Sequence, residues 1–118
     1  MTKIMVVDDS RFMRQRLANL LVDSGYDVVE ADDGEAAVQV YSEVKPDVVF
    51  MDMAMPNKNG NEALHEIKRL DAKARVIILT SMDQQAISIR AMQAGAKAFL
   101  IKPYQPDQVL DTLRDVLA

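Results

Sequence analysis

The sequence predicts an α/β fold in which helices cover both faces of a five-stranded parallel sheet, the doubly wound arrangement. Short apolar runs rich in Val, Ile and Leu alternate with segments of helical periodicity, and the connections between them are short. Three of the runs are almost uninterrupted apolar stretches, which is typical of parallel strands that are covered on both faces. Right-handed crossovers between such strands place the helices on both sides of the sheet.

Five runs of strand length are expected to form the sheet. They are Lys3–Val7, Asp27–Glu30, Asp47–Met51, Arg75–Leu79 and Ala98–Ile101. Ligands of a doubly wound sheet bind at the carboxyl ends of its strands, so the residues that follow each run are the first place to look for a site.

Helices are expected after each strand, and four of them show a single core-facing stripe. The first ends near Gly25 and the second before Pro46, because Gly and Pro are typical of helix ends. The stripes are Met13, Leu17, Leu20 and Leu21; Ala37, Val40, Tyr41 and Val44; Ala63, Leu64, Ile67 and Leu70; and Val109, Leu110, Leu113, Val116 and Leu117. The fourth helix, roughly Asp83–Ala94, is apolar over more of its circumference. Either part of it faces a partner, or it is a tightly packed helix of small residues.

Length and composition favour one domain over residues 1–118 and exclude several classes of function. No charged-then-apolar leader follows Met1, and no apolar run approaches the roughly 18 residues of a membrane span, so we expect a cytoplasmic protein without a membrane partner. Because there is no Cys, any chemistry must use oxygen and nitrogen groups. The net charge of −4 and the pI near 4.9 argue against nucleic acid as a partner. The single His65 lacks a neighbouring ligand or base and is expected on the surface.

Three carboxylates follow two strands that are expected to be neighbours. Asp8 and Asp9 come after the first strand, and Asp52 comes after the third. Clustered anionic oxygens repel one another unless a cation lies among them, and a small set of carboxylates suits Mg²⁺. The alternative is that Asp9 or Ser10 caps the first helix, which is compatible with metal binding by its neighbour.

The fourth strand ends at Thr80 and the fifth at Lys102, so a hydroxyl and an ammonium reach the same edge. A carboxylate nucleophile, a metal, a Lys and a hydroxyl are together the groups that phosphoryl transfer requires. Taken alone, Lys102 could be a surface ion pair and Thr80 a strand-end residue. Their joint spacing indicates a phosphoryl-transfer site.

Five motifs in this order resemble the receiver domains of two-component response regulators over essentially the whole chain. The motifs are Val7-Asp8-Asp9-Ser10, Met51-Asp52-Met53-Ala54-Met55-Pro56 with Asn59-Gly60, Thr80-Ser81, Gly95-Ala96, and Phe99-Leu100-Ile101-Lys102-Pro103. The resemblance implies a flavodoxin-like (βα)₅ topology with strand order 2-1-3-4-5, which is a known order of doubly wound sheets.

The same resemblance assigns roles at the sheet edge. It implies that Asp52 is the phosphorylated residue, that Asp9 binds Mg²⁺ directly, and that Asp8 binds it mainly through water. The backbone carbonyl of Ala54 would complete the protein ligands of the metal, to which Asp52 also belongs. Lys102 would contact a phosphoryl oxygen.

A switch is implied as well. Thr80 would turn its hydroxyl toward the phosphoryl group, and Phe99 would then turn inward into the space that Thr80 leaves. This movement would change the surface formed by the fourth helix, the fifth strand and the fifth helix. The peptide bond before Pro103 is cis in the family.

Within the family, the segments 82–86, 95–97 and 102–106 look most like the stand-alone chemotaxis regulators of the Bacillus and Thermotoga type. That resemblance implies three partners: a chemotaxis histidine kinase, a flagellar motor switch protein and a phosphatase. It also implies a monomer when unphosphorylated and no enzymatic activity beyond the protein's own phosphorylation and dephosphorylation. Phe99 lacks the hydroxyl of the aromatic residue in many relatives, so switching would depend on packing alone.

Three other functions stay open on the sequence. A receiver could act in a phosphorelay, or on an output enzyme in trans. A phosphatase with an aspartyl nucleophile would use a second Asp two residues after the first, where this chain has Ala54. A flavin-binding protein would need a phosphate loop after the first strand, where Asp8 and Asp9 would repel the phosphate.

Overall fold

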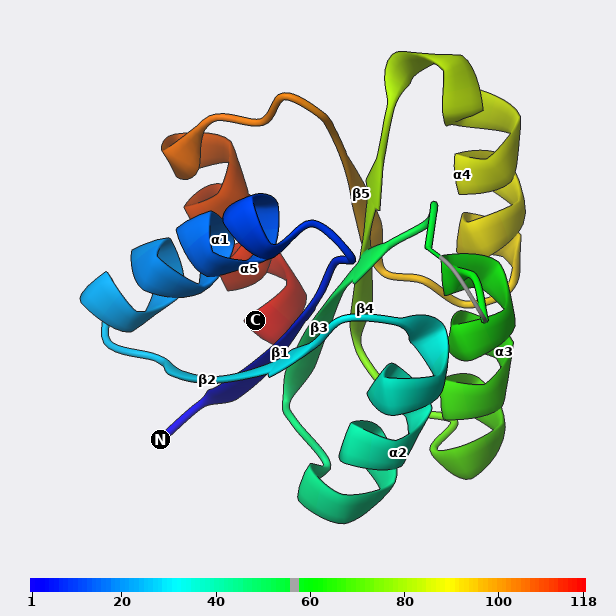
Figure 1. The fold of residues 1–118 in the computed structure, drawn as a ribbon, viewed down its shortest axis with the longest axis horizontal. Helices are drawn as coiled ribbons and strands as arrows, with labels where there is room; N and C mark the ends of the chain where they lie inside the picture. The colour runs from blue at the N-terminus through cyan, green and yellow to red at the C-terminus, as the bar shows by residue number, and fades with distance from the viewer. Residues whose placement is uncertain (56–57) are drawn as a thin grey trace.

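The chain folds into a parallel sheet of five strands with the order β2-β1-β3-β4-β5, which confirms the predicted order (Figure 1). The structure, a computed structural model, describes residues 1–55 and 58–118, so Pro56 of the motif after the third strand lies outside the described residues. The strands are β1 (Lys3–Val7), β2 (Asp27–Ala31), β3 (Val48–Asp52), β4 (Val76–Thr80) and β5 (Ala98–Ile101). The helices are α1 (Arg11–Asp23), α2 (Gly34–Val44), α3 (Gly60–Leu70), α4 (Gln85–Gln93) and α5 (Pro106–Leu117), with a short 3₁₀ helix, η1 (Met82–Gln84), before α4.

Helices cover both faces of the sheet, so the core has two halves. Figure 1 shows α1 and α5 on one face and α2, α3 and α4 on the other. Alternate residues of each strand point to opposite faces, and both sets are apolar. In β1, for example, Ile4 and Val6 pack with α1 and α5, whereas Met5 and Val7 pack with the helices of the other face. This two-sided burial accounts for the nearly continuous apolar runs of the sequence.

Two strands lie one residue further along the chain than the sequence indicates. The main chain of Asp47 already pairs with Lys3, but β3 itself runs from Val48 to Asp52. The amide of Lys3 also donates to the carboxylate of Asp47 at 2.8 Å, so Asp47 serves as a link before the strand. Asp52 and Thr80 are therefore the last residues of β3 and β4, and each has a partner in the neighbouring strand. Their backbones are held by the sheet itself.

The helices begin at polar caps and bury most of the predicted stripes. The hydroxyl of Ser10 accepts a hydrogen bond from the amide of Met13 at 3.3 Å, so Ser10 caps α1 and leaves Asp9 available for another role.

The prediction that Leu70 faces the core is wrong: 57% of it is exposed, because it ends α3 beside a surface loop. On α4, Ile89 and Met92 are exposed, which agrees with its wide apolar distribution. None of the helices in the described part of the chain is long and apolar enough to cross a bilayer.

Replacement of Gly95 by Ala is expected to destabilise the protein by about 1–3 kcal/mol. Gly95 has a φ of +112°, and a Cβ there would lie 2.8 Å from Cε of Lys68. The Lys68 side chain cannot move aside freely, because its ammonium donates to the carbonyls of Ala72 at 2.7 Å and Ala74 at 3.1 Å. Urea unfolding measures the loss. Gly25→Ala is the control: its φ is +96° but nothing lies within 4 Å, so an equal loss in both variants would show that the Lys68 contact has no effect.

Candidate site at the carboxyl edge of the sheet

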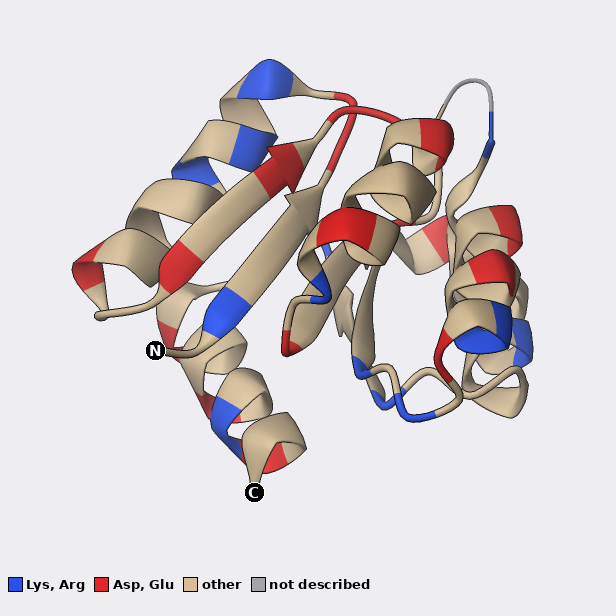
Figure 2. Ribbon diagram, turned by 90° about the horizontal axis from the view of Figure 1, so that it is seen from below, with Lys and Arg blue, Asp and Glu red and all other residues tan. Residues whose placement is uncertain are grey.

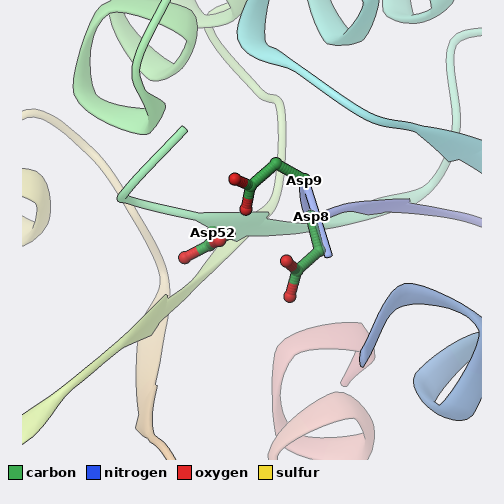
Figure 3. Close-up of side chains that lie close together, drawn as sticks. All are labelled: Asp8, Asp9 and Asp52. Carbon is green, nitrogen blue, oxygen red and sulfur yellow. The ribbon is translucent and has the colours of Figure 1, made fainter. Parts of the chain in front are cut away.

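The three predicted carboxylates meet where β1 and β3 end. Asp8 and Asp9 follow β1, Asp52 ends the neighbouring β3, and one carboxylate oxygen from each lies within 4.8 Å of the other two (Figure 3). Asp8 is 1% and Asp52 is 4% exposed, whereas Asp9 is exposed. The arrangement follows from the topology, since neighbouring parallel strands bring their carboxyl ends to the same edge.

Lys102 supplies the cation of the cluster. Its ammonium lies 3.3 Å from a carboxylate oxygen of Asp8 and 3.3 Å from one of Asp52. The backbone amide of Lys102 donates to the carbonyl of Thr80 at 2.7 Å, which fixes the chain just beyond β5. The peptide bond to Pro103 is cis, as the resemblance implies. The ammonium thus contacts two of the three carboxylates.

Backbone amides fix two of the carboxylates but not the third. The amide of Ser10 donates to Asp8 at 2.9 Å, and the amide of Ala54 donates to Asp52 at 3.3 Å. The side chain of Asp9 has no hydrogen bond or ion pair with any residue that the structure describes. Asp9 is therefore the carboxylate that is most available to a ligand from outside.

The surroundings of Asp52 make its ionisation costly. The pKa of Asp52 is raised to about 6: burial is the largest cause and the charge of Asp8 adds to it, while Lys102 and the amide of Ala54 act in the opposite direction. The pKa of Tyr104 is raised to about 12, first by burial and then by Asp8 and Asp52. Both shifts have burial as their largest cause, so this edge of the sheet is poorly solvated around its carboxylates.

The donor set suits a magnesium ion. Figure 2 shows acidic segments gathered in the loops beyond the ends of the strands. At the site itself, three hard carboxylate oxygens face one ammonium, so a divalent cation would offset the remaining negative charge. Asp9 is exposed and unpaired in the described structure, and this leaves a ligand position that solvent can reach. The residues present thus fit Mg²⁺ and its usual shell of retained waters.

Thr80 and Phe99 line the same cavity. The cavity has a volume of about 550 Å³ and lies between α4 and β5, with Ser88, Ile89 and Met92 among its other walls. Thr80 is buried, and its hydroxyl donates weakly to the carbonyl of Ser81 at 3.4 Å. Phe99 is 44% exposed. The two residues of the predicted switch therefore share an empty space into which either side chain could turn.

Two residues near the site carry no role in the sequence analysis. A Cβ at Gly60 would overlap the carbonyl oxygen of Asp52 and lie 2.7 Å from Cα of Met53, so only glycine allows α3 to begin this close to the end of β3. Arg14 on α1 donates to the backbone carbonyl of Asp8 at 2.9 Å. The sequence does not single out Arg14, because Arg14 is one of three arginines on α1. The motif Asn59-Gly60, in contrast, does contain the glycine. His65 is exposed, as expected.

The fold and the site together define a receiver domain. The family model described as the response regulator receiver domain matches residues 4–114, and the chain belongs to this family. It is 47% identical over 116 residues to the chemotaxis protein CheY of Bacillus subtilis (98% of this chain, 97% of that protein). It is 44% identical over 115 residues to CheY of Thermotoga maritima, with 97% and 96% covered.

A solved structure from the same family shows the same fold. The CheX–CheY–BeF₃–Mg²⁺ complex from Borrelia burgdorferi contains a chain that matches with a TM-score of 0.94 at 30% identity, and the match covers 99% of this chain and 90% of that one. The predicted resemblance to response regulators, and to their chemotaxis branch, is thereby confirmed.

Proposed function

We propose that this chain, as a single receiver domain over residues 1–118, accepts a phosphoryl group from a chemotaxis histidine kinase onto Asp52. The phosphorylated form then binds a flagellar motor switch protein through the surface of α4, β5 and α5. The observation that carries the proposal is the meeting of Asp8, Asp9, Asp52 and Lys102 in one cluster. The similarity to CheY proteins over nearly the whole chain supports the chemotaxis assignment, and the matching complex with CheX supports a phosphatase-type partner.

The chain's own residues account for the transfer. A carboxylate oxygen of Asp52 forms a bond to phosphorus as the bond from phosphorus to the kinase imidazole breaks, and the electron pair of that bond stays on the imidazole nitrogen. Lys102 stands beside Asp52 and offsets the charge on the phosphoryl oxygens. Asp8, Asp9, Asp52 and the carbonyl of Ala54 would hold Mg²⁺, which supplies further positive charge at the phosphoryl oxygens when bound.

The phosphoryl group is proposed to act on the binding surface through Thr80 and Phe99. A new dianion at Asp52 attracts the hydroxyl of Thr80, whose present hydrogen bond of 3.4 Å is weak. Phe99 then turns into the cavity that both residues line, because close packing favours filling a void. Its exposed fraction of 44% would fall, and the surface beside Ile89 and Met92 would change shape.

The test uses Mg²⁺ with beryllofluoride or acetyl phosphate, and a motor switch peptide as the binding probe. The wild type is expected to bind the peptide only in the activated state, and Asp52→Asn is expected to bind it in neither state. Binding that is independent of the phosphoryl analogue would contradict the proposal. Copurification with a phosphotransfer protein in place of a motor switch protein would favour a phosphorelay or an output enzyme in trans. Turnover of a phosphate monoester would favour the aspartyl phosphatase.

Slow loss of the phosphoryl group is expected from the residues at positions 54 and 82. In this family these side chains flank the acyl phosphate, and both Ala54 and Met82 are exposed and unable to orient water by hydrogen bonding. The double variant Ala54→Asn/Met82→Glu should therefore release phosphate faster than the wild type. A phosphate-release assay after removal of the phosphodonor measures both rates, and faster release from the native pair would contradict the expectation.

A further inference from the structure

Arg14 connects the first helix to the backbone of the acidic cluster. Its side chain is only 15% exposed, and it makes two bonds of 2.9 Å: Nη1 donates to the carbonyl oxygen of Asp8, and Nε donates to the carboxylate of Glu30 on β2. The planar guanidinium can hold two acceptors at once in a fixed geometry. Glu30 thus fixes the head group that in turn holds the Asp8 carbonyl.

The bond to Asp8 acts on the peptide unit that joins Asp8 to Asp9. The carboxylate of Asp8 is already held by the amide of Ser10 and by Lys102. The carboxylate of Asp9 has no such partner in the described structure, so its position depends on the orientation of the backbone that carries it. Within the described part of the chain, the Arg14 bond therefore limits rotation of this peptide unit from outside the loop.

The charge of Arg14 and its contact with the Asp8 carbonyl should affect metal binding in opposite directions. A guanidinium near a cation site repels the cation, so removal of its charge should tighten metal binding if the field were all that mattered. The ion pair with Glu30 offsets part of that charge. Positioning and repulsion thus predict changes of opposite sign in metal affinity, and an experiment can separate them.

We infer that Arg14 is a positioning residue for the magnesium site: by holding the Asp8 carbonyl it sets the direction in which the Asp9 carboxylate points. This inference rests on the proposed function, because it gives the acidic cluster the role of a Mg²⁺ site. Arg14 contacts neither the metal ligand oxygens nor the phosphoryl group and acts through the backbone. Outer contacts of this kind typically change metal affinity by about tenfold or more.

The experiment is a Mg²⁺ titration of the full chain by calorimetry, with R14A, R14K and R16A beside the wild type. R14A should bind Mg²⁺ about tenfold more weakly. R14K keeps the charge, but its single ammonium replaces a planar guanidinium that can hold two acceptors at once. Its affinity for Mg²⁺ should therefore lie between those of R14A and the wild type. R16A is the matched control, because Arg16 is an exposed arginine of the same helix whose side chain has no hydrogen bond or ion pair with the residues described. Binding by R14A as tight as that by R16A, or tighter, would overturn the inference.

A second measurement does not need the metal. Hydrogen exchange of the Ser10 amide, which donates to Asp8, should be faster in metal-free R14A than in the wild type and unchanged in R16A. If R14A does not fold, R14K takes its place in both measurements, and wild-type values for R14K would overturn the inference. If the wild type binds no Mg²⁺, the proposed function fails. The exchange rate of Ser10 then still decides whether Arg14 holds this loop.

Discussion

Replacing Asp52 with Asn is expected to abolish labelling by acetyl phosphate and, in the same protein, to increase the stability of the metal-free fold near neutral pH. Labelling ends because an amide is not a nucleophile toward phosphorus at this site. Stability increases because Asp52 is buried beside Asp8, and its ionised form is costly there. A functional residue is often kept at some cost in stability, and Asp52 is expected to be such a residue.

The pH dependence of this gain follows from the direction of the pKa shift. The pKa of Asp52 is raised from 3.8 to about 6 on folding, so the folded state binds the proton more tightly than the unfolded state does. The wild type therefore keeps the full contribution of this group below pH 3.8 and loses it as the pH rises through 6. Asp52→Asn does not titrate, and its advantage should grow from near zero at pH 4 to about 1–3 kcal/mol at pH 7.

Urea unfolding in EDTA between pH 4 and pH 7.5 measures this advantage. Asp9→Asn is a suitable comparison, since Asp9 is exposed and its substitution should change stability little. Adding Mg²⁺ should narrow the difference between Asp52→Asn and the wild type, because a ligand that binds the native state stabilises the form that binds it better. An unchanged free energy of unfolding in Asp52→Asn at pH 7, or residual label on the variant, would contradict this account.

The sequence predicts which residues meet at this edge because the topology of the sheet places them there. Once five apolar runs are identified as parallel strands, the residues that follow them must share one edge, however far apart they are in the chain. Lys102 and Asp8 are 94 positions apart, yet their side chains are within 3.3 Å. The periodicity of the strands and the chemistry of the loops are thus sufficient to predict that the carboxylates and the ammonium meet, and that Thr80 ends a strand at the same edge.

What the sequence does not predict depends on contacts between elements. Arg14 is one of three arginines on α1, and only packing against β2 decides which one reaches the Asp8 carbonyl. The close approach of Gly60 to Asp52 likewise depends on where α3 meets the sheet. Leu70 has the period of a core residue, but the helix ends there. Hydropathy also does not predict that β3 and β4 each end one residue later than their apolar runs. The final residues, Asp52 and Thr80, are polar but still pair within the sheet.

Removal of Lys102 is expected to have the largest combined effect on stability and phosphorylation. In Lys102→Met the apolar stem is retained but the ammonium is lost, and two buried carboxylates at 3.3 Å lose their counter-charge. Breaking one partner from a buried ion pair costs about 3–5 kcal/mol, and since the Lys102 side chain is 25% exposed we expect about 2–4 kcal/mol in EDTA at pH 7. The rate of labelling should fall by about 10²–10³-fold, the usual loss when a group that stabilises developing charge is removed.

The reason for the loss of stability can be tested with a second substitution. If the cost of Lys102→Met comes from unpaired negative charge, removing that charge as well should recover much of it, so Asp52→Asn should stabilise Lys102→Met by more than it stabilises the wild type. Lys97→Met controls for the substitution itself, because Lys97 is exposed and has no ion pair within the described chain. Urea unfolding of the wild type, Asp52→Asn, Lys102→Met and the double variant gives the coupling free energy, and additive effects would show that Lys102 does not stabilise the fold by neutralising Asp52. Mg²⁺ bound at the acidic cluster would replace the positive charge that Lys102→Met removes, so Mg²⁺ should stabilise Lys102→Met more than it stabilises the wild type.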